Sequence, residues 1–290
     1  MEKKKKVKSQ SLGAQTWRRL LKNKGAMIGL IFLALLFTVA LLAPFIFDYE
    51  TDVIGQNIRE RLMKPCAAHP FGTDETGRDL FARVLYGARY SLAIGFGAVT
   101  LGLVVGLITG SIAGFYGGII DSLLMRAIDI FYSIPNILTA VVIVSVLGTS
   151  TVNLIIALAF SCASSFGRIV RAQVMTIRDK EFVESSYAMG LPTWKIIVKH
   201  ILPNCLSPII VQYTLLVGTT IISASSLSFL GIGIPAPSPE WGALLSAGRS
   251  HIRDASYMCV IPGLAVMLTV LALNLVGDGL RDALDPKLKK

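Results

Sequence analysis

The chain has 290 residues, of which 53% are hydrophobic and only 16% are charged, and its mean hydropathy is +0.64. Soluble domains usually carry about 25% charged residues, so this composition indicates an integral membrane protein. The net charge is +10, but the basic residues gather at the start of the chain instead of forming a patch interleaved with aromatic residues. The composition therefore favours contact with membrane lipid and argues against a nucleic-acid partner.

Apolar runs of spanning length occur several times along the chain. A hydrocarbon core about 30 Å thick requires about 20 apolar helical residues, because the backbone polar groups must pair inside the segment. Five uncharged runs meet this requirement. They cover residues 26–47, 91–114, a segment ending at 131–147, 209–230 and 257–276. A sixth run, 152–166, is shorter, and we expect its helix to continue past Gly167 into water.

The first run follows a lysine-rich segment that resembles the start of a signal peptide. The run is 22 residues long and no small-residue cleavage site follows it, so we interpret it as an uncleaved span. Six spans place both termini on one side of the membrane. The two tails, the 115–130 turn and the 167–205 loop hold 20 of the 28 Lys and Arg residues, which predicts that these parts are cytoplasmic.

These observations divide the chain into five expected regions. A core of five helices contains the cytoplasmic 167–205 loop, and the remaining regions flank it. The regions are a basic tail at 1–25, a first transmembrane helix at 26–47, an outer loop at 48–90, the core at 91–277 and a tail at 278–290. On the outer side, three prolines within five residues exclude a regular helix from 231–242, and we expect this segment to lie against protein or to dip toward the bilayer.

The 167–205 loop contains a corner between two expected short helices. Gly190 is a natural helix end and Pro192 can begin the next helix. Small side chains surround the carboxylate of Glu184 on the first of these helices. Such side chains allow a partner backbone to come close while one acid fixes the register, which predicts a docking surface. The small residues are Ser185, Ser186 and Ala188.

This corner resembles the EAA motif of ABC importer permeases, through which those subunits dock on their ATPases. The resemblance rests on Glu184-Ser-Ser-x-x-x-Gly190 followed by Leu202-Pro203, with two serines in place of alanines and His200 where isoleucine is common. Further motifs resemble the C-type permease of dipeptide, oligopeptide and nickel importers. They are His69-Pro-Phe-Gly-Thr-Asp-x-x-Gly-Arg-Asp79, Met125-Arg-x-x-Asp129, Ser226-Leu-Ser-Phe-Leu-Gly231, Pro239-x-Trp-Gly242 and Asn274-Leu-x-Gly-Asp-x-Leu-Arg-Asp-x-Leu-Asp-Pro286.

The resemblance implies a type I ABC importer permease fold with six transmembrane helices in a bacterial plasma membrane. It also implies four partner subunits of three kinds: a second permease, two ABC ATPases and an external substrate-binding protein. Residues 184, 185, 186, 188, 190, 202 and 203 would then couple transport to ATP hydrolysis. The chain has no Gly-Lys-Ser or Gly-Lys-Thr, so it lacks a phosphate-cradling loop of its own, and ATP with Mg²⁺ is expected on the partner ATPases. We expect no cofactor in this chain and no catalytic residue.

Two further groups of polar residues lie in or near the spans. Arg126 and Asp129 are three residues apart at the inner end of the third span, which predicts an intramembrane ion pair, either functional or structural. The fifth span carries many Ser and Thr residues, and we expect Gln212, Ser223 and Ser226, but not Cys162, to line the substrate path. Helix packing explains such hydroxyls equally well.

Metal binding and other transport mechanisms remain as alternatives. Several sulfur and imidazole groups that could bind a metal ion lie in the outer segments. Their spacing defines no metal site, so we expect no metal ion to bind there. These residues are Cys66, His69, His251, Met258 and Cys259. The cargo is therefore predicted to be a dipeptide or oligopeptide, with nickel as the alternative. A secondary transporter or channel would instead need inverted repeats and mid-bilayer ion-binding residues, which the sequence does not display.

Overall fold

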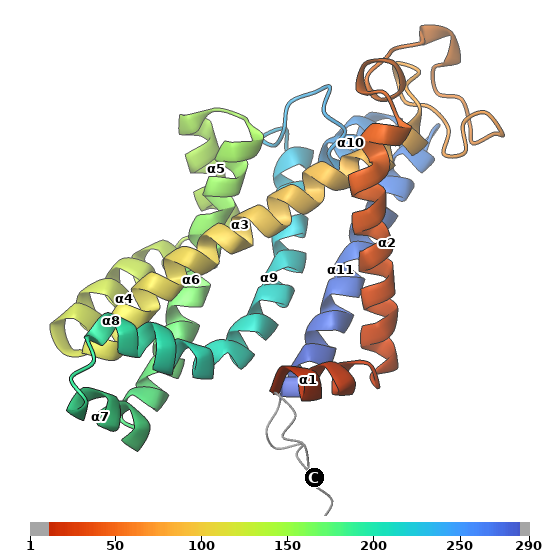
Figure 1. Cartoon of the computed structure of the whole chain (residues 1–290). Helices are drawn as coiled ribbons and strands as arrows, with labels where there is room; N and C mark the ends of the chain where they lie inside the picture. The colour runs from red at the N-terminus through yellow and green to blue at the C-terminus, as the bar shows by residue number, and fades with distance from the viewer. Residues whose placement is uncertain (1–11, 285–290) are drawn as a thin grey trace, which may run out of the picture.

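The computed structural model describes residues 12–284, which form a helical bundle whose only extended pairing is one bridge between Thr73 and Asp79 (Figure 1). Five helices are long and apolar enough to cross a membrane, and α4 with α5 counts as a sixth span when the pair is taken together. The five are α2 (Lys24–Ile46), α3 (Leu80–Tyr116), α6 (Thr151–Arg178), the continuous helix Thr193–Phe229 that ends as α9 (Leu202–Phe229), and α11 (Tyr257–Leu284). The expected all-α fold is confirmed.

Shorter elements connect the spans. They are α1 (Leu12–Leu20), the π-helical turn η1 (Tyr49–Val53), the 3₁₀ turn η2 (Ile58–Glu60), α4 (Gly118–Ser133), α5 (Asn136–Leu147), α7 (Glu181–Ala188), α8 (Thr193–Ile196), the π-helical turn η3 (Ile197–Ile201), α10 (Trp241–Gly248) and the 3₁₀ turn η4 (Arg249–His251). Side-chain caps begin several of the helices, because the first amides of a helix have no intrahelical partner. Asp79 accepts from Ala82 N at 2.9 Å to begin α3, and Ser150 accepts from Asn153 N at 3.1 Å to begin α6.

A ladder of glycines brings α3 and α6 into direct backbone contact. Gly102, Gly106, Gly110 and Gly114 recur every fourth residue, so they share one face of α3. A Cβ added at Gly106 would lie 2.3 Å from the Cβ of Phe166, and the other three would also meet α6 atoms within 3 Å. Small residues at this spacing allow membrane helices to pack backbone to backbone, so α3 and α6 form one tightly joined pair.

The third span is not the straight helix that its apolar run suggests. α4 and α5 meet at 90° across Ile134 and Pro135, where Ile134 takes an extended conformation (φ −90°, ψ 131°). Proline has no N–H and excludes the helical conformation at the residue before it, which is the physical reason for the break. We call residues 131–138 the α4–α5 elbow.

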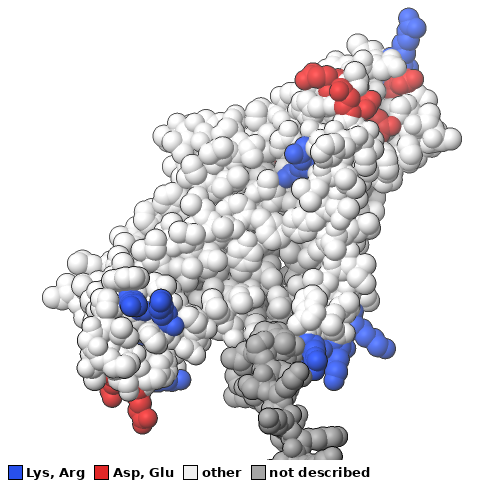
Figure 2. All heavy atoms as spheres, viewed as in Figure 1, with Lys and Arg blue, Asp and Glu red and all other residues white. Residues whose placement is uncertain are grey.

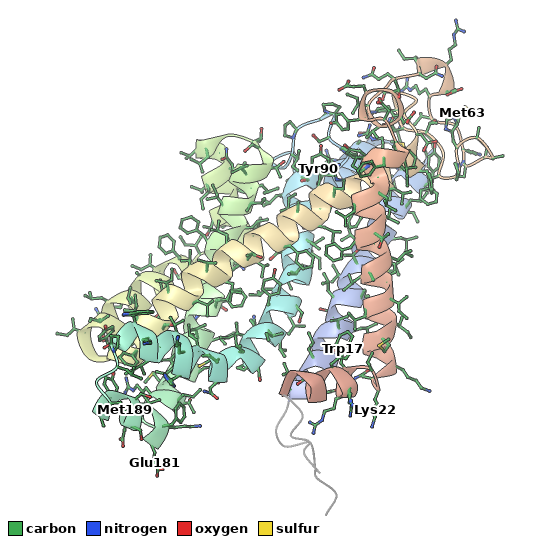
Figure 3. The ribbon with its side chains drawn as sticks, viewed as in Figure 1. Trp17, Lys22, Met63, Tyr90, Glu181 and Met189 are labelled. Atoms are coloured by element: carbon green, nitrogen blue, oxygen red, sulfur yellow. The ribbon has the colours of Figure 1, made fainter. Side chains whose placement is uncertain are left out.

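The two ends of the bundle carry different elements (Figure 1). α1 packs against the end of α11, where Asn23 Nδ2 donates to Asp282 Oδ2 at 3.4 Å, and this end also carries α7 and α8. The opposite end carries the 48–79 segment, α10 and η4. In Figure 3, Glu181 and Met189 lie at one extremity of the molecule, and Met63 lies at the other. The described chain therefore begins and ends at the end of the molecule that carries the corner, as six spans require.

Charges are concentrated at these two ends, and the surface between them is almost uncharged in the view of Figure 2. Acidic side chains gather over the 48–79 segment, which includes Glu50, Asp52 and Glu60. Basic side chains cluster at the other end, where α1 carries Arg18 and Arg19. This distribution is that of a protein with an apolar belt between two wet surfaces.

Candidate functional site

The corner between α7 and α8 is held in place by apolar contacts with the bundle. Val183 and Ile196 are fully buried, and the rings of Tyr187 and Phe115 stack at 6.1 Å, which joins α7 to the end of α3. Arg178 at the end of α6 donates through Nη1 to the carbonyl of Gly114 at 2.9 Å. The corner is therefore attached to the α3–α6 pair on one side, while η3 continues without a break into α9 on the other.

Gly190 forms the turn of this corner. Its φ is +74°, the left-handed region that side chains with a Cβ rarely adopt, and its N–H donates to the carbonyl of Tyr187 at 2.9 Å. No atom lies within 4 Å of the position that a Cβ would take. The glycine is needed for backbone conformation and not for space.

The predicted coupling residues divide between an inner and an outer face. Ser186 is buried, and its Oγ donates to the carbonyl of Phe182 at 2.8 Å, so this small residue serves packing within the chain. Glu184, Ser185 and Ala188 are exposed on the outer face of α7, and Glu184 has no ion pair within residues 12–284. Leu202 and Pro203 are the first two residues of α9 and follow the π-helical turn η3 directly.

Large apolar side chains surround these exposed residues. Met189 is 70% exposed and Trp194 is 65% exposed, although both lie at the wet end of the molecule. Phe182, Tyr187 and Val198 are also exposed there. Large apolar side chains exposed outside the membrane belt are a feature of protein-binding surfaces. These apolar side chains near the exposed carboxylate of Glu184 were not part of the sequence interpretation, although the Phe-x-x-x-x-Tyr-x-Met pattern from Phe182 to Met189 would have indicated them.

The three predicted path residues share a stripe on α9. Gln212, Ser223 and Ser226 lie eleven and three residues apart, so they fall on one helix face together with Thr219. All of them are at least partly exposed. The hydroxyls of Ser223 and Ser226 donate to the carbonyls four residues earlier, at 3.0 and 2.8 Å. Cys162 is buried and lies 3.5 Å from the hydroxyl of Thr220, away from this stripe.

The expected pair of Arg126 and Asp129 is not formed. Asp129 lies 3.9 Å from Arg168 of α6, and the Arg168 guanidinium lies 3.3 Å from the centre of the Tyr132 ring. α4 runs beside α6, so the partner comes from the neighbouring helix instead of the same one. A stronger pair joins the same helices nearby, because Arg171 binds both carboxylate oxygens of Asp121, at 2.5 and 2.6 Å.

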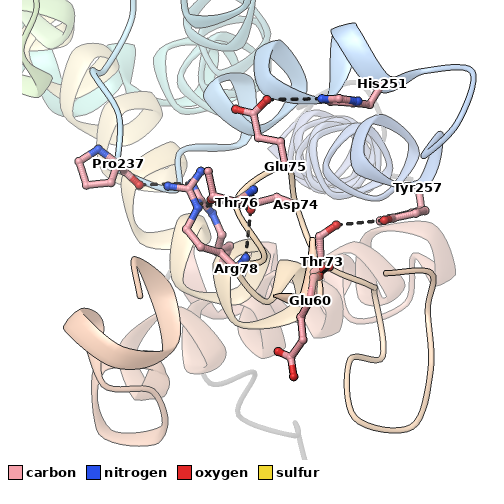
Figure 4. A network of polar contacts seen from close by, with 10 residues as sticks. Glu60, Thr73, Asp74, Glu75, Thr76, Arg78, Pro237, His251 and Tyr257 are labelled. Carbon is pink, nitrogen blue, oxygen red and sulfur yellow. Dashed lines mark hydrogen bonds and ion pairs between the residues drawn. The ribbon is translucent and has the colours of Figure 1, made fainter. Parts of the chain in front are cut away.

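At the other end of the molecule, the 48–79 segment, the first turns of α3 and residues 230–256 form one unit that we call the outer cap. Its centre is the buried carboxylate of Asp74, which accepts from Arg78 Nε at 2.7 Å and from Arg83 Nη1 at 2.9 Å (Figure 4). Arg83 also donates through Nη2 to the carbonyl of Pro237 at 3.2 Å. Tyr257 OH donates to the carbonyl of Thr73 at 3.0 Å, which attaches α11.

The carboxyl group of Asp74 stays ionised because of these contacts. Burial alone would raise its pKa, but the charges of Arg83 and Arg78, with amide donors from Arg78 and Thr76, outweigh burial and hold the pKa below its ordinary value. The residues of the Thr-Asp-x-x-Gly-Arg-Asp motif therefore have a structural role, as a cluster of ion pairs and hydrogen bonds around Asp74. Residues 230–240, which form no regular helix, as expected for the proline-rich stretch, pack against the start of α3, and a Cβ at Gly87 would lie 2.0 Å from the carbonyl oxygen of Pro239; α10 begins at Trp241.

The imidazole and sulfur groups of the outer cap do not converge. His69 lies 2.6 Å from Asp79 and 3.4 Å from Glu60, whereas His251 lies 3.5 Å from Glu75. All four cysteines are free. Across residues 12–284, no group of three or more His, Cys, Asp or Glu side chains is placed to hold a metal ion.

An all-helical membrane subunit with an exposed helical corner at one end and a polar cap at the other is the architecture of a transporter permease. Residues 102–290 match the family described as the binding-protein-dependent transport system inner membrane component, and residues 11–65 match the N-terminal TM domain of oligopeptide transport permease C. The chain belongs to this family of binding-protein-dependent ABC importer permeases. Such permeases are multi-pass membrane subunits that work with a second permease, ATPases and a binding protein.

Individual relatives agree with this assignment. The chain is 47% identical to the dipeptide transport system permease protein DppC of Alkalihalophilus pseudofirmus, over 95% of this chain and 90% of that protein. It is 46% identical to the glutathione transport system permease protein GsiD of Escherichia coli O157:H7, over 94% and 90%. The fold is similar to a chain of the inward-facing MetNI methionine ABC transporter, with a TM-score of 0.57, 23% identity, and coverage of 71% of this chain and 98% of that one.

Proposed function

We propose that this chain is the permease subunit of an ATP-driven importer for dipeptides or oligopeptides. The observation that carries the proposal is the 47% identity to a dipeptide permease along 95% of the chain. The second permease would complete the translocation path, an external binding protein would deliver the peptide, and two ATPase subunits carrying ATP and Mg²⁺ would drive the cycle. Glutathione is a second candidate substrate because a glutathione permease is almost equally similar.

The exposed face of the corner is the proposed contact with the ATPases. Glu184 supplies a carboxylate near exposed apolar side chains that include Met189 and Trp194, so an ATPase groove with an apolar wall and a basic group would complement this face. The helix from Thr193 to Phe229 is continuous, so a displacement of the corner would shift α9 as a rigid element. Alternating access would follow from this coupling.

The proposed orientation puts the corner and both ends of the chain in the cytoplasm. The basic cluster on α1 and the acidic surface of the outer cap support this orientation, because basic residues are retained on the cytoplasmic side (Figure 2). The outer cap, with its 230–242 segment, would then face the binding protein. The stripe of Gln212, Ser223 and Ser226 on α9 is proposed to contribute hydrogen-bonding groups to the path.

The test uses the complete complex of both permeases and both ATPases in proteoliposomes with the binding protein. ATP-dependent uptake of a labelled dipeptide is expected, and labelled glutathione and nickel are measured in parallel. Glu184→Lys should abolish uptake and release the ATPases, whereas Glu181→Lys, a charge reversal at another exposed position of the same helix, should retain them. Uptake of glutathione or nickel but not dipeptide would refute the peptide assignment, and retained ATPases in Glu184→Lys would refute the docking role.

A further inference from the structure

The α4–α5 elbow lies beside the middle of α6. Phe131 packs on Phe160 with 5.8 Å between ring centres, and Asn136 lines the same small recess as Ser161 of α6. α6 begins at residue 151, so the elbow lies about 15 Å along its axis from that end, at 1.5 Å per residue. The interruption between the helices α4 and α5 is therefore inside the apolar belt and not at its surface.

The elbow leaves backbone polar groups without helical partners. A helix end exposes its last carbonyls or its first amides, and both kinds of end meet here. Pro135 provides no side-chain cap for the first amides of α5. On the other side of the break, Ser133 Oγ donates to the carbonyl of Ile130 at 2.7 Å, so one carbonyl of α4 has a side-chain partner. Irregular backbone at membrane depth is tolerated only where protein or water covers it.

The polar side chains at and beside the elbow are also unsuited to lipid. All residues from 131 to 138 are exposed, including the polar Ser133 and Asn136. The neighbouring Asp129 side chain is 64% exposed and only loosely paired with Arg168. Exposed charges and amides inside the bilayer are costly and face cavities or protein. α2 differs, because the exposed side chains near its centre are apolar apart from Thr38, whose hydroxyl donates to the carbonyl of Ala34; Leu35, for example, is 62% exposed.

We propose that the α4–α5 elbow forms this chain's wall of the water-filled translocation path, opposite the second permease. Water would satisfy the free amides of α5 when the path is empty. The carbonyl groups of a passing peptide would replace that water at the same amides and at Asn136. This inference rests on the proposed function, since it assigns a surface to the path of the same importer.

Cysteine accessibility in the complete complex tests the proposal. Cys66, Cys162, Cys205 and Cys259 are first replaced by Ala, and Asn136→Cys is compared with Leu35→Cys, which is also at an exposed position but lies on α2. A membrane-impermeant methanethiosulfonate is added from both sides. Asn136→Cys should react at least about tenfold faster, because only a hydrated thiol forms the reactive thiolate. Modification should block uptake, and a transported dipeptide should slow modification.

The outcomes separate this inference from the proposed function. Equal modification rates of Asn136→Cys and Leu35→Cys would refute the proposal that the elbow lines a water-filled path. An unreactive Asn136→Cys that cross-links to the second permease would refute it as well. Rapid modification without protection by dipeptide would leave the elbow in the path and would count against the peptide assignment. If Asn136→Cys failed to assemble, Ser133→Cys, exposed on the same elbow, would carry the same expectations.

Discussion

Asp74 holds the outer cap together, so its removal should destabilise the protein strongly. Its side chain is 4% exposed and that of Arg83 is 5% exposed, at 2.9 Å from each other. In Asp74→Ala the guanidinium of Arg83 stays buried without a counter-charge, and such a broken pair costs about 3–5 kcal/mol. At about 2–4 °C per kcal/mol, the apparent Tm should fall by roughly 10 °C.

Heating the detergent-solubilised complex and measuring the remaining monodisperse fraction gives this apparent Tm. Asp254→Ala, which removes an exposed carboxylate from the same cap, should leave it unchanged. A decrease of less than about 2 °C in Asp74→Ala would refute the reasoning, because it would mean that water reaches Arg83 and screens its charge.

The same carboxylate predicts a pH dependence. Its pKa is lower in the folded protein than the ordinary 3.8, so its stabilising contribution is complete above that value and is lost as the pH falls through the folded pKa. The difference in Tm between wild type and Asp74→Ala should therefore be constant from pH 7 to pH 5 and should narrow below pH 3.8. A difference that stayed constant to the lowest accessible pH would contradict the assigned cause.

Three further substitutions test other parts of the structure. Gly190→Val should weaken ATPase binding because a β-branched residue at φ +74° costs about 1–2 kcal/mol, whereas Gly190→Asn should retain it; pull-down of the ATPases distinguishes them. Ser223→Leu with Ser226→Leu should lower uptake per assembled complex, and poor assembly with normal uptake per complex would instead indicate helix packing. Gly106→Leu should reduce the amount of folded protein in the membrane, since its Cβ would meet Phe166 at 2.3 Å; normal abundance would contradict the close packing.

The sequence predicted helices well where an apolar run was uninterrupted, and less well where charges were satisfied by tertiary contacts. α2 and α11 begin within two residues of the predicted spans because nothing interrupts their apolar runs. α3 begins eleven residues before its predicted start, since Arg83 and Arg89 break the apolar run. No local pattern indicates that the charge of Arg83 is compensated by Asp74 from the preceding loop.

In the candidate site, too, features set by local sequence were predicted and features set by tertiary packing were not. The bend between α4 and α5 was signalled by Pro135, but the apolar residues on both sides of it suggested one continuous span. The partner of Asp129 depends on how α4 packs on α6, and i,i+3 spacing gives no information about that. Ser186 was expected on the docking face with Ser185, yet on a helix adjacent residues point about 100° apart, and one of the two had to face the bundle.

The glycine ladder between α3 and α6 has a mechanical consequence. Two helices in backbone contact over four successive turns have no side-chain layer to deform, so the pair should tilt as a single stiff beam. One end of this beam contacts the corner through Phe115, and the other end carries the outer cap through Arg83. A small tilt applied through the proposed ATPase contact at the corner would therefore displace the outer end of the beam in the opposite direction. Closing one gate and opening the other would be a single movement.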